Sequence, residues 1–364
     1  MTSPTRLVRP AIGVAAGLAL VAGLASGLAR TGVGSGLGSI TLHGPLLVLG
    51  FFGAVIGAER AVGLGRPWAW MAPGLAALSI AFVVGGADPA VTALATVGSG
   101  LALCAVFLVA HRIQPERHLQ VMAIGAVSYL GAGVAWALGG APADLVPWLA
   151  GFLVLTIAGE RLELARMVRI SSAAHRVMLA TVAVFVSGAV ASLVAGEIGP
   201  RVAGAGLLGM AMWLGRYDVA RRTVRMSGVT RYMAVALLGG YVWLAISGSI
   251  WAIFGLEPGT LVYDAGVHGL FLGFVMSMVF AHAPIVLPSV LGWDLPYRPL
   301  LWLPLGLLHA SVAVRVAADL AGAQTLRAWA GSANVVAIAS FGLIAGWLIV
   351  GARSASRDRV ITPR

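Results

Sequence analysis

The sequence contains seven histidines, and four of them fall in apolar stretches long enough to cross a membrane. These four are His43, His268, His282 and His309. An ionisable side chain inside a membrane-spanning helix is energetically costly, and such residues commonly serve a function. The other three lie beside arginines in expected loops, where a solvated side chain is the simpler interpretation: His111, His118 and His175.

His43 and His268 lie at similar depths in two expected helices that are far apart in the sequence. Each falls one or two turns inside the end of its helix on the same side of the membrane. Histidine is a common axial ligand of haem iron, so this pair is suited to hold a haem. Asp264 precedes His268 by four residues and shares its helix face. We therefore expect His43 and His268 to be metal ligands, with the Asp264 carboxylate accepting the second ring N–H of His268.

His282 and His309 extend the set of candidates. His282 follows His268 by fourteen residues, so it faces the same side of the helix at the opposite membrane surface and is a further candidate metal ligand. His309 lies near the middle of the eleventh expected helix, with Arg315 two turns further out on roughly the same face. We expect His309 and Arg315 to contact the cofactor, because a guanidinium there could neutralise a haem propionate or an anionic substrate.

The composition determines the environment in which these residues are placed. Of 364 residues, 59% are hydrophobic and 10% charged, and the mean hydropathy is +0.95. A soluble domain carries about 25% charged residues, so the chain is predicted to be an integral membrane protein. The single cysteine, Cys104, excludes an internal disulfide framework, and no nucleotide-binding loop or zinc motif is present. The expected partners are the lipid bilayer and a small-molecule or gas ligand, and no nucleic acid.

Apolar runs interrupted by charge predict about twelve membrane-spanning helices in a single all-α domain, residues 1–364. The connections between them are short. The predicted spans are 10–29, 40–58, 68–87, 89–110, 119–139, 143–160, 177–196, 201–215, 231–255, 260–282, 299–320 and 327–351.

The arginines predict the orientation of the chain. All 24 basic residues are arginines, and 20 of them fall at the termini or in even-numbered loops, while the net charge is +11. The four exceptions are Arg30, Arg201, Arg315 and Arg327. Short arginine-rich loops stay on the cytoplasmic side, so we expect a plasma-membrane protein with both termini in the cytoplasm.

Three even-numbered spans share a sequence register that indicates an internal helix-pair repeat. Gly50-Phe51, Gly151-Phe152 and Gly273-Phe274 each begin nine residues before a Glu or His at the end of the helix. A parallel duplication explains this register, with repeats expected around 40–110, 119–175, 177–230 and 231–298.

At these residues the chain resembles the NnrS family, twelve-span membrane proteins that contain haem and copper and are associated with nitric oxide metabolism. The early family motif, His-x-His-Glu-Met-x-Phe-Gly-Phe, is matched by His43 and by Gly50-Phe51, and a later His-Ala-Leu motif by His268-Gly269-Leu270. The resemblance implies a haem-binding, and also copper-binding, protein of nitrosative-stress or respiratory haem chemistry.

The chain departs from the family pattern at the early motif, where Pro45 and Leu46 replace the second His and the Glu. The family is also distantly similar to the core subunit of haem–copper oxidases. Copper ligands of that subunit come from the sixth and seventh helices, but residues 143–160 and 177–196 contain no histidine. Oxygen reduction at a binuclear centre is therefore not expected.

Two other functions are compatible with the sequence. A proton-coupled secondary transporter without a prosthetic group would also have parallel repeats and glycine-rich helices. Its cytoplasmic gate would consist of Glu59, His111, Glu160 and His282. An assembly partner of a larger membrane complex would need no site of its own. The sequence does not decide whether the chain is an enzyme.

Overall fold

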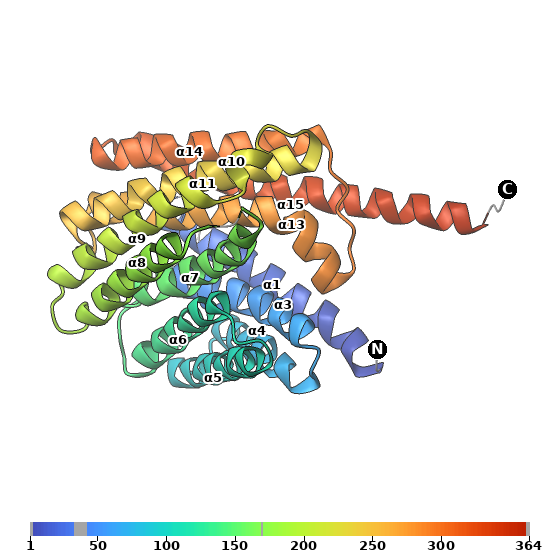
Figure 1. The fold of residues 1–364 in the computed structure, drawn as a ribbon, viewed down its shortest axis with the longest axis horizontal. Helices are drawn as coiled ribbons and strands as arrows, with labels where there is room; N and C mark the ends of the chain where they lie inside the picture. Colours follow the sequence, from blue (N-terminus) through green and yellow to red (C-terminus); the bar gives the residue numbers. More distant parts are fainter. Residues whose placement is uncertain (1–2, 33–41, 169, 362–364) are drawn as a thin grey trace.

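The structure is a computed structural model and describes residues 3–32, 42–168 and 170–361. Within these residues the chain forms helices and no strands. Neighbouring long helices pack lengthwise against one another in one elongated bundle (Figure 1). This architecture follows from the composition, because in lipid only a helix satisfies all of its backbone hydrogen bonds within one segment.

Twelve long helical segments build the bundle in the described part of the chain. They are α1 (Ser3–Ala29), α2–η2–α3 (His43–Pro45, Leu46–Phe52, Gly53–Leu64), η3–α4 (Pro67–Trp70, Met71–Val84), α5 (Pro89–Ile113), α6 (Arg117–Ala137), α7 (Val146–Leu164), α8 (Ser172–Ala191), α9 (Ile198–Tyr217), α11 (Gly228–Phe254), α12–η5–α13 (Leu261–His268, Gly269–Met276, Ser277–Leu291), η6–α14 (Pro299–Leu301, Trp302–Leu320) and α15 (Gln324–Ile361). Two short helices, η4 (Ala165–Val168) and α10 (Ala220–Thr223), lie in the connections.

Ten of these twelve segments are long and apolar enough to cross a membrane, judged over the described residues. The two others are α7 and α9. α7 does not qualify because three charged residues, Glu160, Arg161 and Glu163, fall in its last five positions. Glycine and two arginines lower the hydropathy of α9. Over the described residues the chain is thus all-helical with ten candidate membrane spans, two fewer than the sequence predicted.

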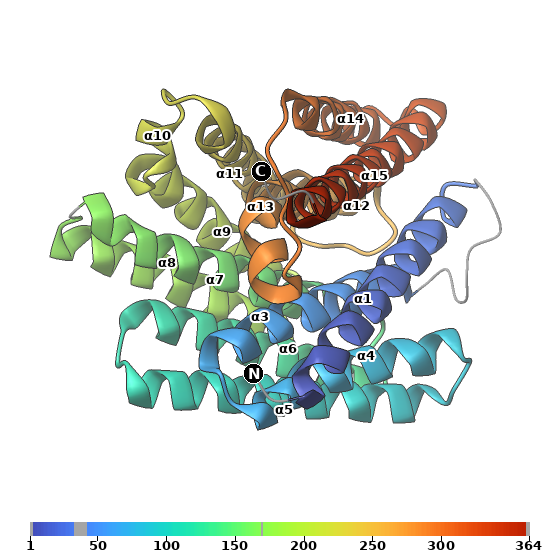
Figure 2. The ribbon, with the colours of Figure 1, turned by 90° about the vertical axis from the view of Figure 1, so that its right-hand side faces the viewer.

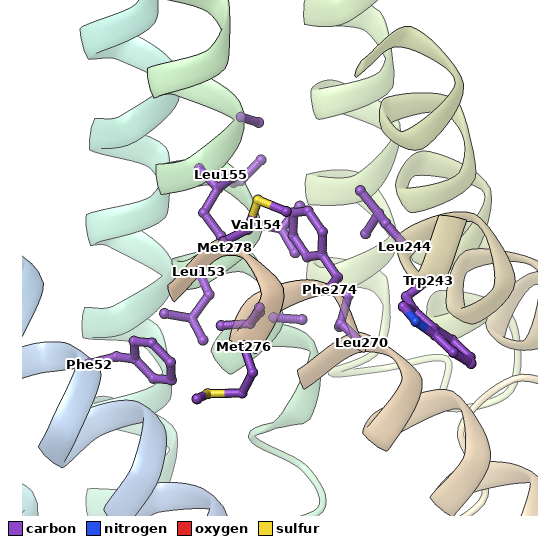
Figure 3. Close-up of a cluster of buried hydrophobic side chains, with 14 of the residues drawn as sticks. Phe52, Leu153, Val154, Leu155, Trp243, Leu244, Leu270, Phe274, Met276 and Met278 are labelled. Carbon is purple, nitrogen blue, oxygen red and sulfur yellow. The ribbon is translucent and has the colours of Figure 1, made fainter. Parts of the chain in front are cut away.

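The three segments that share the Gly-Phe register lie in the middle of the bundle. Figure 2 shows α3, α7 and α13 inside, with α1, α4–α6, α8–α11 and α14–α15 around them. Contacts join η2 and η5 to α7, and α3 to α13, and α7 is buried over most of its length. Figure 3 shows side chains of all three segments, among them Phe52, Leu153 and Phe274, in one buried apolar cluster. The duplication that we inferred from this register stays a prediction.

Small residues allow the helices to approach closely. On the α8–α9 contact, a Cβ added to Gly188 would lie 2.1 Å from the backbone nitrogen of Ala203. On α3, a Cβ on Gly53 would lie 2.8 Å from the Tyr129 ring. Lipid supplies no hydrophobic force between helices, so this backbone proximity provides the packing.

The two ends of the bundle carry different ionic contacts. Even-numbered loops meet at one end, which we call the arginine-rich end. The contacts there are Arg60 Nη2–Glu160 Oε1 (2.6 Å), Arg161 Nε–Asp218 Oδ2 (3.8 Å) and the pair Arg166–Glu116. The opposite end, which we call the histidine end, contains His43, His268 and the ion pairs described below.

Candidate functional site

His43 and His268 face each other at the histidine end of the bundle. Their ring centroids are 6.5 Å apart and their planes differ by 7°. The stacked pair Phe280–Phe341, by comparison, has centroids only 3.9 Å apart. The two imidazoles, which come from α2 and α12, are therefore nearly parallel, with their centroids near the upper limit of the range for aromatic pairs.

Both histidines lie within one helical turn of the start of a π-helical segment. η2 begins at Leu46, three residues after His43, and η5 begins at Gly269, immediately after His268. A π-helical segment within a longer helix occurs frequently at functional sites, because the wider turn redirects the side chains around it. No feature of the sequence had indicated these segments.

Side-chain hydroxyls donate to a carbonyl inside each π-helical segment. The Tyr129 hydroxyl donates to the Leu49 carbonyl at 2.9 Å, and the Ser277 hydroxyl donates to the Gly273 carbonyl at 2.6 Å. These bonds satisfy carbonyl groups that have no water to bind in the membrane interior. The irregular backbone beside each histidine is thus held in place by its neighbours.

The ring of His268 is fixed by a backbone carbonyl. Its Nδ1 lies 2.9 Å from the carbonyl oxygen of Asp264, one helical turn earlier, and 3.4 Å from Oδ1 of the same residue. A carbonyl oxygen only accepts hydrogen bonds, so Nδ1 carries the proton and Nε2 keeps its lone pair. We expected the Asp264 carboxylate in this role; the backbone carbonyl is the closer acceptor because the carboxylate is bound to arginines.

Asp264 belongs to a four-residue ion network that joins α12, α14 and α15. Its Oδ2 accepts from Arg315 Nη2 at 2.7 Å and from Arg327 Nη2 at 2.9 Å. Arg327 Nε lies 2.9 Å from Oδ1 of Asp319, and Arg315 Nε lies 3.9 Å from Oδ2 of Asp319. The Asp319 side chain is fully buried and the Arg315 side chain is 7% exposed. Two arginines and two aspartates make the network neutral.

Arg315 also contacts the imidazole of His268. Its Nη2 is 3.5 Å from Nδ1 and 3.4 Å from Nε2. An in-plane position equidistant from both nitrogens would collide with the carbon between them, so the guanidinium lies over the ring face. The Nε2 lone pair, which lies in the ring plane, therefore stays directed away from Arg315.

A cavity of about 230 Å³ lies between these helices and is partly open at its rim. Its wall is mainly apolar, with contributions from α1, η2, α7, η5 and α15. The polar side chains that line it are Arg30, Thr31, His43, Tyr263, Asp264, His268, Arg315, Arg327 and Asn334. An apolar cavity with a few convergent polar groups is the usual form of a small-molecule or cofactor site.

Asn334 is the polar group of the cavity that most needs a partner. The residue is 2% exposed, and neither Oδ1 nor Nδ2 has a hydrogen-bond partner among the described residues. A buried amide left unsatisfied costs about 1–3 kcal/mol. A ligand or water in the cavity would remove this cost, so Asn334 indicates that the cavity is built to be filled.

His309 and His282 lie away from the cavity. The Nδ1 atom of His309 accepts from the Trp243 indole at 2.9 Å, and its Nε2 lies 3.4 Å from the Ser277 hydroxyl. Arg315 follows His309 by six positions, so their directions on the helix differ by about 120°. Of the two, only Arg315 lines the cavity. His282 lies near the arginine-rich end, with Nδ1 2.6 Å from the Met278 carbonyl oxygen.

The three histidines expected in loops differ in their environments. His111 lies in the last turn of α5, not in a loop, and is half-buried. His175 is exposed in the first turn of α8, as expected. His118 was also expected to be solvated, but it is 5% exposed at the start of α6, with Nε2 3.7 Å from Glu163 Oε2. That expectation is wrong because α6 begins earlier than the hydropathy indicated and packs its first turn against α7.

A family model described as a domain of unknown function (DUF8744) matches residues 8–350. The chain belongs to this family. No curated protein and no solved structure matches the chain. The DUF8744 description assigns no activity, so the function of this member must be argued from its site.

Arg30 and Arg327 line the site but were not among the predicted site residues. Both belong to the four arginines that fall outside the termini and even-numbered loops. Three of the four arginines that break the charge bias, Arg30, Arg315 and Arg327, line this one cavity. The positive-inside rule does not explain arginines at the histidine end of the bundle. Each of these exceptions was therefore a candidate to bind another residue or a ligand. Asn334 carried no comparable signal.

Proposed function

We propose that the protein is an integral membrane protein that binds haem through His43 and His268. The observation that carries the proposal is the separation of the two nearly parallel imidazoles, 6.5 Å between centroids across a single cavity. A metal–imidazole bond is about 2 Å long, so two imidazoles on opposite sides of one metal have centroids about 6 Å apart. A single iron fits this interval.

The surrounding residues support the same proposal. The backbone bond from His268 Nδ1 leaves Nε2 as the free ligand atom, which is the arrangement common for metal-binding histidines. Arg30 supplies a cation for a carboxylate of a haem, and Asn334 supplies an unsatisfied amide. Arg315 and Arg327 also line the cavity, with their charge balanced by Asp264 and Asp319. A bound haem would supply one-electron chemistry or gas binding, and the resemblance to NnrS proteins favours nitric oxide or respiratory haem chemistry.

The cavity, about 230 Å³ in volume and partly open at its rim, is smaller than a porphyrin macrocycle. Haem binding therefore requires the flexible side chains that line it, such as Leu47 and Met276, to move. A larger side chain in the cavity wall should hinder this movement and so reduce haem binding.

We further propose that the arginine-rich end faces the cytoplasm, which puts both termini there and the histidine site near the outer surface of the plasma membrane. The support is the bias of arginines toward the loops that meet at this end.

A secondary transporter is the second candidate, favoured by one observation. Both helices that carry the cavity histidines contain a π-helical segment, and local departures from regular α-helix occur frequently at functional sites, including the substrate sites of transporters. In that case the cavity binds a transported molecule, and Glu59 and Glu160, which share Arg60 as an ion partner, belong to the gate at the opposite end.

The test is to purify the protein in detergent from cells supplied with haem, and to record the absorbance spectrum, the pyridine haemochrome and the metal content. We expect a Soret band with about one haem per chain, lost in His43→Ala and in His268→Ala. The matched controls are His175→Ala and His309→Ala, which change histidines outside the cavity and should keep the band.

The same experiment separates the alternatives. Copper at one atom per chain without a haemochrome would indicate a metal ion in place of haem. Neither metal nor haem, together with proteoliposome uptake that Glu59→Gln abolishes, would favour the transporter.

A further inference from the structure

A second pocket lies at the arginine-rich end, on the far side of the molecule from the histidine cavity. It has a volume of about 580 Å³ and lies where the connections η4–α8 and α9–α11 meet. Four arginines line it together with a few apolar, hydroxyl and acidic side chains: Arg216, Arg221, Arg222 and Arg225, with Val168, Ile170, Ser171, Tyr217 and Asp218.

None of the four arginines has a carboxylate within 4 Å among the described residues. Asp218, the acidic residue of the pocket wall, has a fully buried side chain that is directed into the bundle. Its Oδ2 accepts from the Tyr241 hydroxyl at 3.0 Å and lies 3.8 Å from Arg161 Nε, and its Oδ1 accepts from the Ala220 amide. The pocket is therefore strongly positive, with an excess that the protein itself does not neutralise.

The positive-inside bias explains arginines in these loops but not their convergence on a concave site. Arg221 donates to the Arg216 carbonyl at 3.0 Å, and the guanidinium of Arg216 lies 5.2 Å from the Tyr217 ring centroid. These contacts hold two of the four side chains in place. The side chains of Arg222 and Arg225 make no hydrogen bond or ion pair within the described chain and are exposed.

We propose that this pocket binds the phosphate group of an anionic phospholipid. Guanidinium groups bind phosphate oxygens with paired, charge-assisted hydrogen bonds. The pocket lies at the ends of the long helices, the level of lipid headgroups, and Val168, Ile170 and Tyr217 give it an apolar and aromatic wall suited to the glycerol and upper chain region of a lipid. Basic pockets between membrane helices are known to hold such headgroups.

The test measures binding of a short-chain phosphatidylglycerol to the full-length protein in neutral detergent, with phosphatidylcholine of equal chain length and inorganic phosphate as the other probes. The variant is Arg222→Gln/Arg225→Gln, which removes two guanidiniums without breaking an internal contact. The control is Arg112→Gln/Arg117→Gln, which removes two exposed arginines from the end of α5 and the start of α6, at the same end of the bundle but outside the pocket.

We expect the wild type and the control to bind phosphatidylglycerol at least tenfold more tightly than phosphatidylcholine, and the pocket variant to lose this preference at an unchanged thermal unfolding midpoint. Equal loss in both variants would mean general charge attraction and would overturn the proposal. Tight binding of inorganic phosphate with no preference for phosphatidylglycerol would assign the pocket to a soluble phosphate and would also overturn it. Neither result depends on haem.

Discussion

The ion network of Asp264 gives a prediction whose size follows from its geometry. Asp264→Asn keeps the shape of the side chain but removes the carboxylate, which lies within 3 Å of both Arg315 and Arg327. Asp319 is then the remaining carboxylate of the network. Removing one partner of a buried ion pair costs about 3–5 kcal/mol. Arg327 is 26% exposed and keeps Asp319 at 2.9 Å, so most of the cost comes from the buried Arg315.

The double variant Asp264→Asn/Arg315→Gln tests this reasoning. It removes one charge of each sign and leaves the Arg327–Asp319 pair neutral. We therefore expect the double variant to be no less stable than Asp264→Asn alone, with a favourable coupling energy in the double-mutant cycle. Exposed Asp294, changed to Asn, is the control and should alter stability by less than about 0.5 kcal/mol.

The assay is reversible unfolding of the detergent-purified protein with increasing sodium dodecyl sulfate. Two results would refute the account: a loss below about 1 kcal/mol in Asp264→Asn, or additive losses in the double variant. Either would mean that the carboxylate does not compensate Arg315.

Three further predictions concern residues around the cavity and the core. Gly27→Leu should fold, because a Cβ there would meet only the His43 ring at 3.9 Å, but it should reduce haem content measured by pyridine haemochrome; unchanged content would place the ligand elsewhere. Asn334→Leu should raise the free energy of unfolding of the ligand-free protein by about 1–3 kcal/mol, because it removes an unsatisfied buried amide. A lower free energy of unfolding would show that the amide is already satisfied. Tyr129→Phe should cost about 1 kcal/mol, since the buried hydroxyl donates to the Leu49 carbonyl, and no loss would mean that this bond does not hold η2.

The arrangement of helices was largely predictable because the bilayer limits the choices. Apolar length predicted where most helices begin to within a few residues, but α3 and α13 run on six and nine residues beyond the predicted ends. Arginine asymmetry correctly grouped the even-numbered loops at one end. The span count was less secure, since charges at the end of α7 and glycines in α9 lower their hydropathy while packing keeps both in the bundle.

The matched depth of His43 and His268 was predictable from the sequence, but the contact between their helices and the details around them were not. Depth fixes the height of a residue along the bundle and says nothing about which helices are neighbours or which face is turned inward. Arg315 and His309 show this, because they are close in sequence yet face different neighbours. The π-helical segments are set by tertiary contacts such as the Tyr129–Leu49 bond, which no local pattern records.

The most direct test of the account is the pyridine haemochrome of the purified wild type beside His43→Ala and His268→Ala. The account predicts about one haem per wild-type chain and none retained in either variant, while His175→Ala stays at the wild-type level. Wild-type protein without haem, or variants that keep it in full, would contradict the assignment of these two imidazoles as ligands of one iron.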